Sequence, residues 1–551
     1  LPISSKTVRS EALETETSLP NFRQGDAIIL YERNRDTDNV TNKMVFKGNI
    51  EYLTENEISI RLRATQQNPS VLPAESLYAI EHDTMDTTFR SMYQGLYIYL
   101  SARKERRDLL LSQRPPRFDE SLDSMISRSE DDFTRIALKA KAAQDYFLLI
   151  GPPGTGKTSC ALKKMVETFH ADKDAQILLL SYTNRAVDEI CKSLASIAPA
   201  VDFIRVGSEL SCDEAYRGHL IENELSSCNR RSEVYERIRN CRIIVGTVAA
   251  ISGKPELFRL KHFDVAIIDE ATQILEPQLL GILCARGEDG KDAIDKFVLI
   301  GDHKQLPAVV QQNTEQSAIY DESLLSIGLT NLKDSLFERL YRNCTATVHR
   351  SYDMLCRQGR MHPEVALFAN RAFYGGRLIP VGLPHQIESS DTICRLAFYP
   401  SVPEKAGASA KINYSEARIV ADLAARIYED HQTDFDESRT LGIITPYRSQ
   451  IALIKKEIES LGIPALNRIL VDTVERFQGS ERDVIIYSFC VNYPYQLKFL
   501  SNLTEEEGVL IDRKLNVALT RARKQMFITG VPELLERNPL YKSLLKLIES
   551  F

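Results

Sequence analysis

Short, uninterrupted apolar runs recur through much of this chain, and polar segments with helical spacing separate them. The first set consists of residues 146–150, 177–180, 243–246, 265–268 and 297–300. Strands that are apolar at every position are buried on both faces, which is typical of a parallel sheet with helices on each side. A second set follows at residues 441–444, 469–471, 484–487 and 526–528. The sequence therefore predicts an α/β chain with two parallel sheets, each in a unit of about 200 residues.

Residues 23–86 carry a different pattern, with short alternating apolar runs between polar turns. Such spacing is typical of the strands of a small β-barrel. Residues 87–116 place apolar side chains at roughly helical spacing, which predicts a helical stalk. The expected order is a tail or linker (1–22), a β-barrel (23–86), a helical stalk (87–116), a first α/β domain (117–340) with a helical insertion at about 208–240, and a second α/β domain (341–551).

Composition excludes some classes of protein. With 551 residues, 43% of them hydrophobic and 26% charged, the chain is typical of soluble globular proteins with several cores. No apolar run approaches the roughly 20 residues that span a bilayer, so we expect no membrane partner. The cysteines form no C-x-x-C pair, which argues against a zinc or iron–sulfur site and favours reduced thiols inside a cell. Because the chain begins with Leu1 rather than Met, we expect a piece of a longer polypeptide.

A glycine-rich loop of the form G-x-x-x-x-G-K-T directly follows the apolar run 146–150 and precedes a helical pattern. Glycines let backbone N–H groups surround phosphates at a helix N-terminus, where the helix dipole favours anions. In such a loop Lys157 reaches the β- and γ-phosphates, and the Thr158 hydroxyl ligates Mg²⁺. The strand–loop–helix context disfavours a chance glycine-rich turn. The loop predicts an ATP site at Gly151, Pro152, Pro153, Gly154, Thr155, Gly156, Lys157 and Thr158.

A pair of acidic residues, Asp269 and Glu270, follows the apolar run 265–268. A carboxylate at the end of a neighbouring strand is what a phosphate-binding loop needs on its metal side. Asp269 is therefore expected to hold Mg²⁺, directly or through water, and Glu270 to orient and deprotonate the attacking water. The alternative is an ordinary solvated helix start, which an isolated acidic pair more often forms.

The string Asp269-Glu-Ala-Thr-Gln273 resembles motif II of the superfamily 1 helicases. The branch concerned includes the nonsense-mediated-decay RNA helicase and the replication nuclease-helicase, and the helicase part of the latter is the more similar. The resemblance runs from about residue 23 to residue 531 and implies two tandem RecA-like domains. Later segments agree in order, namely Gly301-Asp-His-Lys-Gln-Leu-Pro307, Arg360-Met-His-Pro363, Ile444-Thr-Pro-Tyr-Arg448, Val471-Asp-Thr-Val-Glu-Arg-Phe-Gln-Gly-Ser-Glu481 and Leu515-Asn-Val-Ala-Leu-Thr-Arg-Ala-Arg523.

The resemblance assigns further roles at the nucleotide. Gln305 corresponds to a sensor of the γ-phosphate, and Gly479 and Glu481 to residues that meet the phosphates and ribose from the second domain. Arg360 and Arg521 correspond to arginine fingers, which stabilise the negative charge that develops on a departing phosphoryl group. Taken alone, an arginine near the end of a helix more often lies on an exposed cationic face.

Polar residues that follow the predicted strands are candidates for contact with a nucleic-acid strand. Hydroxyls, amides and backbone N–H groups at strand ends suit phosphate contacts that read no base. Each of these residues alone is more often a plain cap or turn residue. Tyr182 and Tyr447 are candidates for base stacking, because the chain contains no tryptophan. The predicted strand contacts are Ser181, Thr183, Asn184, Thr247, Thr445, Tyr447, Arg448 and Thr473.

Two positions depart from the family pattern, and both concern the nucleobase. The helix expected near residues 131–143 lacks the glutamine that recognises adenine in this branch, and Phe133 stands near that position. Gly359 replaces the aromatic residue that the family carries beside the adenine. We therefore expect weaker nucleotide affinity or looser selectivity for ATP.

The leading hypothesis is an ATP-driven helicase or translocase that moves 5′ to 3′ along single-stranded DNA, with ATP and Mg²⁺ as cofactors. The polarity is implied by the resemblance alone. RNA is the alternative strand; an ATP-switched clamp on nucleic acid and an ATPase that remodels proteins are alternative classes. The net charge of −7 gives no global sign of nucleic-acid binding, but a local basic groove suffices. We expect a monomeric, nucleoid-associated or nuclear motor. A nuclease domain is expected upstream of the residues given, but no nuclease activity from these residues, because residues 1–22 contain no nuclease motif.

Overall fold

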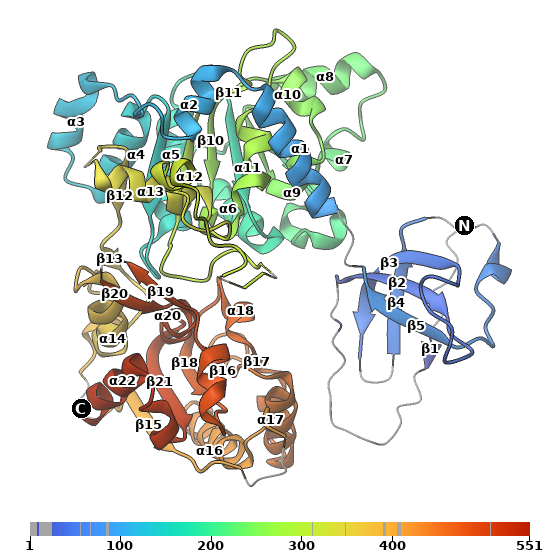
Figure 1. Cartoon of the computed structure of the whole chain (residues 1–551), viewed down its shortest axis with the longest axis vertical. Helices are drawn as coiled ribbons and strands as arrows, with labels where there is room; N and C mark the ends of the chain where they lie inside the picture. The colour runs from blue at the N-terminus through green and yellow to red at the C-terminus, as the bar shows by residue number, and fades with distance from the viewer. Residues whose placement is uncertain are drawn as a thin grey trace. The chain divides into compact units, whose positions relative to one another are not determined.

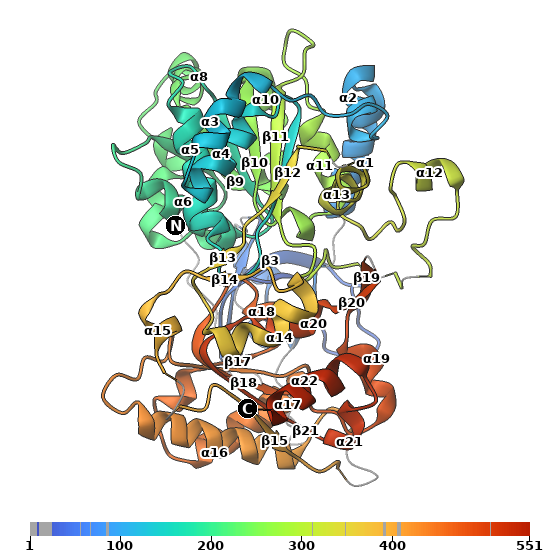
Figure 2. The same cartoon turned by 90° about the vertical axis from the view of Figure 1, so that its left-hand side faces the viewer.

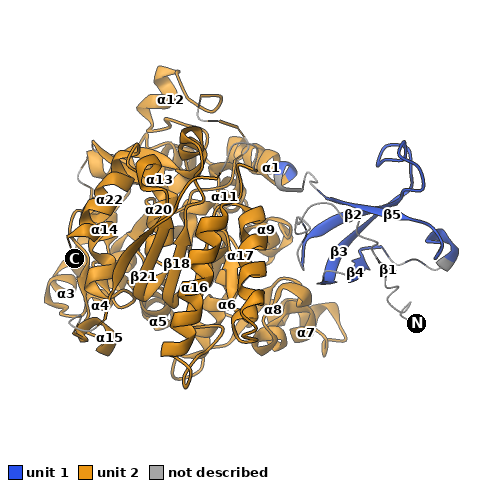
Figure 3. Cartoon of the chain, turned by 90° about the horizontal axis from the view of Figure 1, so that it is seen from below, with its two compact units in different colours: residues 1–90 blue, residues 91–551 orange. Residues whose placement is uncertain are grey.

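The protein is described from a computed structural model, which places residues 8–9, 22, 25–54, 57–64, 66, 68–83, 87–310, 312–313, 315–347, 349–389, 393–404, 409–506 and 508–550. The chain divides into two compact units, Leu1–Arg90 and Ser91–Phe551 (Figure 3). Among the described residues, no helix combines the length and apolar character needed to cross a bilayer.

The first unit contains an antiparallel sheet in the order β1-β4-β3-β2-β5. Its inward side chains, including Ile28, Phe46 and Ile50, form a small core, as expected for strands whose side chains alternate between two faces. The predicted strands are present, while closure of the sheet into a barrel stays a prediction. Most of the predicted tail, 1–22, lies outside the described residues. The strands are β1 (Val8–Arg9), β2 (Ala27–Glu32), β3 (Val45–Leu53), β4 (Glu57–Leu62) and β5 (Tyr78–His82).

The second unit contains two α/β lobes (Figures 1 and 2). The first lobe is built on a seven-stranded sheet in the order β12-β6-β11-β10-β7-β9-β8, and every pairing in it is parallel. The strands are β6 (Tyr146–Ile150), β7 (Ile177–Ser181), β8 (Phe203–Val206), β9 (Ile243–Thr247), β10 (Phe263–Ile268), β11 (Ile294–Gly301) and β12 (Tyr352–Met354).

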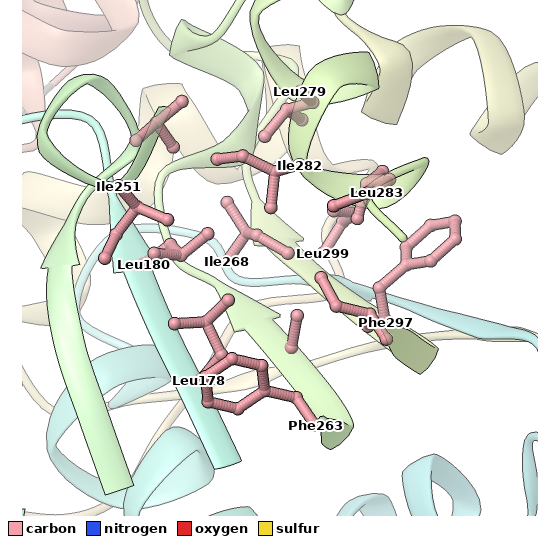
Figure 4. Close-up of a cluster of buried hydrophobic side chains, with 14 of the residues drawn as sticks. Leu178, Leu180, Ile251, Phe263, Ile268, Leu279, Ile282, Leu283, Phe297 and Leu299 are labelled. Carbon is pink, nitrogen blue, oxygen red and sulfur yellow. The ribbon is translucent and has the colours of Figure 1, made fainter. Parts of the chain in front are cut away.

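Both faces of this sheet are covered, as the continuous apolar runs predict. Leu148 and Leu178 belong to a core shared with α11 (Glu276–Leu283) and α13 (Leu336–Ala346). Their neighbours Leu149 and Leu179 belong to a core on the opposite face. That core is shared with α4 (Asp132–Ala142), α5 (Lys163–His170) and α6 (Asn184–Ala195). Figure 4 shows strand side chains such as Leu180, Ile268 and Leu299 facing Ile282 and Leu283 of α11.

The segment predicted as a stalk holds α1 (Thr87–Ser101) and α2 (Lys104–Leu110). Helix α1 packs closely on α11 through two glycines, because a Cβ atom on Gly95 would lie 2.4 Å from the carbonyl oxygen of Pro277. The segment predicted as an insertion, 208–240, contains short 3₁₀ turns with α7 (Ile221–Glu224) and α8 (Arg231–Asn240). Further helices of this lobe are α3 (Asp123–Arg128), α9 (Val248–Ser252), α10 (Glu256–Leu260) and α12 (Glu322–Ser326).

The first lobe extends past the expected domain boundary at residue 340, which falls inside α13. Phe337 and Leu340 of this helix pack in the first lobe's core, and β12 then pairs with β6. The sheet pairing therefore assigns residues up to Met354 to the first lobe. Strand β12 was missed from the sequence because its three residues, Tyr-Asp-Met, do not form an apolar run.

The second lobe has a five-stranded parallel sheet in the order β15-β21-β18-β16-β17. Together with the first lobe it confirms the predicted pair of tandem RecA-like domains. Strand β15 was also missed from the sequence. The strands of this sheet are β15 (Leu396–Pro400), β16 (Leu441–Ile444), β17 (Leu470–Asp472), β18 (Arg482–Ser488) and β21 (Ala522–Gly530). Short pairs outside it are β13 (Arg357–Gln358) with β14 (Ile379–Pro380), and β19 (Leu503–Glu506) with β20 (Val509–Asp512).

Helices α14 and α20 lie on the side of this lobe nearest the first lobe in both Figures 1 and 2. They share a core with the sheet and with α22. The helices of the lobe are α14 (Pro363–Tyr374), α15 (Pro384–Ile387), α16 (Tyr414–Asp430), α17 (Arg448–Ser460), α18 (Val474–Phe477), α19 (Leu497–Leu500), α20 (Arg513–Leu519), α21 (Pro532–Leu535) and α22 (Pro539–Glu549).

Candidate active site between the two lobes

The predicted phosphate loop and the predicted acidic residues meet at one edge of the first lobe's sheet. Strands β6, β11 and β10 are neighbours and run parallel, so the segments after their carboxyl ends lie together. These segments begin at Gly151, Asp302 and Asp269. The N–H of Gly151 donates to the carbonyl of Gly301 at 2.9 Å, which ties the start of the loop to the end of β11.

The loop itself requires glycine at two positions. Gly154 and Gly156 have φ of +73° and +76°, a region that side chains with a Cβ atom rarely adopt. A Cβ atom on Gly154 would also lie 2.4 Å from Cβ of Arg360, and the carbonyl of Gly154 accepts from the N–H of Gly359 at 2.8 Å. The backbone of the second lobe at Gly359 and Arg360 therefore contacts the backbone of the phosphate loop directly.

The charged residues of the first lobe are already paired with each other. Lys157 Nζ lies 2.6 Å from Glu270 Oε1, and Thr158 Oγ1 donates to Asp269 Oδ2 at 2.5 Å. Burial raises the pKa of Asp269, although the nearby Lys157 ammonium opposes this effect. Burial alone would also raise the pKa of Glu270, but the facing Lys157 outweighs it, so this pKa is lowered. Glu270 is therefore a carboxylate at neutral pH and can accept a proton.

Glu270 adopts an uncommon backbone conformation for its residue type, with φ of +53°. Its N–H donates to Asp269 Oδ1 at 2.9 Å, and its Oε2 accepts from Nε2 of Gln273 at 2.9 Å. Strained positions of this kind persist where the surroundings fix them, and they cluster at functional sites. Gln273 belongs to the quoted motif, but its role in holding Glu270 was not predicted.

Arg521 of the second lobe reaches the same site. Its Nη2 donates to Oε1 of Gln305 in the first lobe at 3.0 Å, and the residue is only 2% exposed. Burial, with Arg360 nearby, lowers the pKa of Arg521 to about 9. The guanidinium is therefore still cationic at neutral pH.

Arg360 is held by its own lobe. Its Nε donates to Glu481 Oε2 at 2.6 Å, and its Nη1 donates to the carbonyl of Thr520 at 3.2 Å. The side chain of Gln358 accepts from the Arg360 N–H at 3.0 Å, which orders the turn. Gly479, with φ of +76°, precedes Ser480 and Glu481 on the same side of the lobe. The structure thus gathers the predicted phosphate-site residues of both lobes around one place.

The predicted strand contacts form two groups, one on each lobe. Ser181 and Thr247 are register partners at the ends of β7 and β9, and Thr183 caps α6 next to Asn184. On the second lobe the N–H of Thr445 donates to Asp472, directly before Thr473. Exposure differs within each group, since some side chains are buried and others face solvent. Ser181, Thr247 and Thr445 are buried; Thr183 and Asn184 are exposed; Tyr447, Arg448 and Thr473 are partly exposed.

Internal hydrogen bonds limit what three of these side chains can do. The Ser181 hydroxyl donates to the carbonyl of Asp269 at 3.2 Å, and the Thr247 hydroxyl accepts from the N–H of Ala250 at 3.1 Å. These two hydroxyls therefore support the strand ends in this state rather than face a ligand. Tyr447 is held in a similar way, because its OH accepts from Gln496 Nε2 at 3.2 Å. Tyr182, which is 38% exposed, is the freer candidate for base stacking.

Comparison with known proteins agrees with the motifs. Two models described as "AAA domain" match, one over residues 128–234 and 221–313 and the other over residues 332–533. The DNA replication ATP-dependent helicase/nuclease JHS1 of Arabidopsis thaliana is 28% identical over 99% of this chain and 40% of its own length. The DNA replication ATP-dependent helicase/nuclease DNA2 of Homo sapiens is 28% identical over 95% of this chain and 48% of its own length. The chain is related to the superfamily 1 helicases.

The relationship reaches beyond the replication enzymes. The DNA polymerase alpha-associated DNA helicase A of Saccharomyces cerevisiae is 24% identical over 83% of this chain and 73% of its own length. The chain spans about half the length of the helicase/nucleases that it matches. The sequence-based resemblance to superfamily 1 is thereby confirmed for most of the chain.

Proposed function

We propose that the chain is an ATP-driven nucleic-acid motor, which hydrolyses ATP between its two RecA-like lobes while moving along a single strand. The observation that carries the proposal is the composite site, in which Arg521 of the second lobe is hydrogen-bonded to Gln305 of the first. Lys157 and Glu270 lie in the same site. A site shared between lobes makes hydrolysis depend on their approach, which is what couples a chemical cycle to movement.

The residues fit a nucleotide with Mg²⁺. The hydroxyl of Thr158 and the carboxylate of Asp269 lie 2.5 Å apart, and oxygen donors of this kind suit Mg²⁺. The φ angles of Gly154 and Gly156 and the position of Lys157 suit a phosphate cradle at a helix start. Thr158 and Asp269 would hold the Mg²⁺, which when bound would supply positive charge against the phosphates.

Each side chain of the composite site has a separate role in the proposed hydrolysis. Lys157 balances phosphate charge once nucleotide draws it away from Glu270, and the released carboxylate accepts the proton of the attacking water. Arg360 and Arg521 stabilise charge on the phosphoryl group, while Gln305 links that group to the second lobe. Gly479 and Glu481 contribute contacts from the second lobe.

Support for DNA as the strand comes from the relatives, which are named DNA replication helicase/nucleases and a DNA helicase. RNA is the alternative, and both strands offer the same phosphates to Thr183, Asn184, Arg448 and Thr473. Movement from 5′ to 3′, a monomeric state, a nuclear or nucleoid location and an upstream nuclease domain belong to the same proposal. Nuclease activity is assigned to that upstream domain and to no residue described above.

The test combines hydrolysis with unwinding. ATP hydrolysis is measured with and without single-stranded DNA or RNA, and unwinding is measured on duplexes with a 5′ or a 3′ tail. A DNA motor of the proposed polarity hydrolyses ATP much faster with DNA and opens only the 5′-tailed DNA duplex. A protein remodeller ignores the added strand, and a clamp binds the strand tightly without rapid hydrolysis. Either of these outcomes contradicts the proposal.

A further inference from the structure

An open series of four buried side-chain hydrogen bonds crosses between the lobes beside the candidate site. Asp302 and Gln305 belong to the first lobe, and Tyr374, Asn516 and Arg521 to the second. All five residues are at most 5% exposed. The distances are 2.7 Å from Gln305 Nε2 to Asp302 Oδ2, 2.7 Å from Tyr374 OH to Asp302 Oδ2, 2.8 Å from Asn516 Nδ2 to Tyr374 OH, and 3.0 Å from Arg521 Nη2 to Gln305 Oε1.

Asp302 fixes which end of the Gln305 amide faces Arg521. The carboxylate accepts hydrogen bonds, so it takes the NH₂ end of the amide and leaves the carbonyl end for the guanidinium. The reverse orientation would set the amide NH₂ against arginine donors and its oxygen against a carboxylate. The contact between Gln305 and Arg521 therefore depends on the position of Asp302.

Tyr374, the last residue of α14, joins Asp302 to the second lobe. Burial raises the pKa of Tyr374 well above its ordinary value of 10, so the phenol keeps its proton and donates it to the carboxylate. The same oxygen accepts from Asn516, whose Nδ2 also donates to the carbonyl of Lys304 at 2.7 Å. Asn516 lies in α20, the helix that leads directly to Arg521. One hydroxyl thus connects the end of β11 to the helix that precedes Arg521.

We propose that Tyr374 is a positioning residue. It holds the two lobes together through Asp302 and Asn516 and thereby keeps Gln305 and Arg521 in contact for hydrolysis. Tyr374 contacts neither the phosphate loop nor the Lys157–Glu270 pair in the described hydrogen bonds, so it acts through Asp302 and Asn516. This inference rests on the proposed function, because the contact that it positions matters only if the site hydrolyses nucleotide.

The chain offers a matched control. Tyr541 is also buried, and its OH donates to Asp512 Oδ2 at 2.8 Å, but both residues belong to the second lobe and lie outside this series of hydrogen bonds. Replacement of either tyrosine by phenylalanine removes one buried tyrosine–aspartate hydrogen bond and keeps the ring. Only Tyr374→Phe removes one that crosses between the lobes.

The experiment measures kcat and KM for strand-stimulated ATP hydrolysis in the full chain, its Tyr374→Phe variant and its Tyr541→Phe variant. We expect Tyr374→Phe to lower kcat about 10-fold with KM changed less than about 2-fold, because a hydrogen bond to a charged group is lost on the path to the arginine. Tyr541→Phe should stay within about 2-fold of the unmodified chain in both constants. Equal effects of the two variants, or an effect on KM alone, would contradict the proposed positioning role of Tyr374.

A double-mutant cycle separates positioning from loss of stability. If Tyr374 acts through Asp302, adding Tyr374→Phe to Asp302→Asn lowers kcat no further than Asp302→Asn alone. Independent, multiplying losses would contradict the proposal, even if Tyr374→Phe also lowers the melting temperature. Failure of the proposed function has a different signature, since the unmodified chain would then show no strand-stimulated hydrolysis at all.

Discussion

The phosphate end and the base end of the candidate nucleotide site are built differently. At the phosphate end, Lys157 and Glu270 form an ion pair, and Arg521 is buried and hydrogen-bonded across the lobes. At the end where the family resemblance places the base, the Phe133 ring packs against the loop, with its Cζ 3.4 Å from where a Cβ of Gly156 would lie. Gly359 adds no side chain there, and a Cβ on it would lie only 3.2 Å from Leu383 Cδ1.

This difference separates chemistry from recognition. Charged groups with fixed partners respond strongly to substitution, because each removal leaves a buried charge or polar group without its partner. A ring that offers only apolar contact discriminates between ligands weakly, by about 10- to 200-fold at most, whereas hydrogen-bonding sites reach far higher ratios. We therefore expect large effects at the phosphate end and small ones at the base end.

Replacing Arg521 should have the largest effect. Arg521→Ala removes the second-lobe charge that faces the phosphate site, and kcat should fall on the order of 10³-fold. Lys524→Ala is the control, because Lys524 Nζ lies 3.1 Å from Asp483 Oδ2 in the same lobe and removing it also deletes a positive charge. Steady-state hydrolysis of the two variants checks the prediction, and similar losses for both would remove Arg521 from the proposed mechanism.

Glu270→Gln comes next. The amide keeps the shape of the side chain but cannot accept a proton, so kcat should fall about 10²- to 10³-fold. Nucleotide binding should be retained or strengthened, because Lys157 is freed from its carboxylate partner. Binding of a fluorescent nucleotide, measured beside hydrolysis, checks both halves. Loss of binding in this variant would argue for a structural rather than a catalytic carboxylate.

The smallest effect is expected at the base end. Turnover with ATP and with GTP should agree within about threefold, because apolar contact with Phe133 distinguishes the two bases poorly. Phe133→Ala should raise KM a few-fold for both nucleotides alike, and Phe133→Gln should favour ATP by adding an amide. A strong preference of the unmodified chain for ATP would show that another group recognises adenine.

Much of the fold was predictable because its signals are local. The apolar runs predicted the strands on both sheets, and the strand before the phosphate loop predicted its place at a sheet edge. Strands β8, β12 and β15 were missed. An arginine interrupts the apolar run of β8, β12 has only three residues and contains an aspartate, and β15 ends in proline. The boundary at residue 340 was misplaced for a related reason, because α13 carries an ordinary amphipathic pattern that does not say which sheet it covers.

The candidate site shows the same contrast between residues marked by local motifs and residues whose role depends on distant partners. Lys157, Thr158, Asp269 and Glu270 were predictable because short motifs fix them at strand ends. The part played by Tyr374 was not, because a tyrosine at the end of a helix carries no sign of a partner 72 residues away. Likewise, nothing in the sequence segments around Ser181 and Thr247 indicated that their hydroxyls form hydrogen bonds within the first lobe.

The sequence by itself determined the two α/β lobes, the phosphate loop and the acidic pair, because backbone conformation and strand burial depend on neighbouring residues. Only the tertiary structure decided which charges meet across the lobes. Gln305 and Arg521 are 216 residues apart, and their contact exists because two separately folded sheets present complementary ends to each other. Short local motifs determine each half of the site, and the packing of the two lobes brings the halves together.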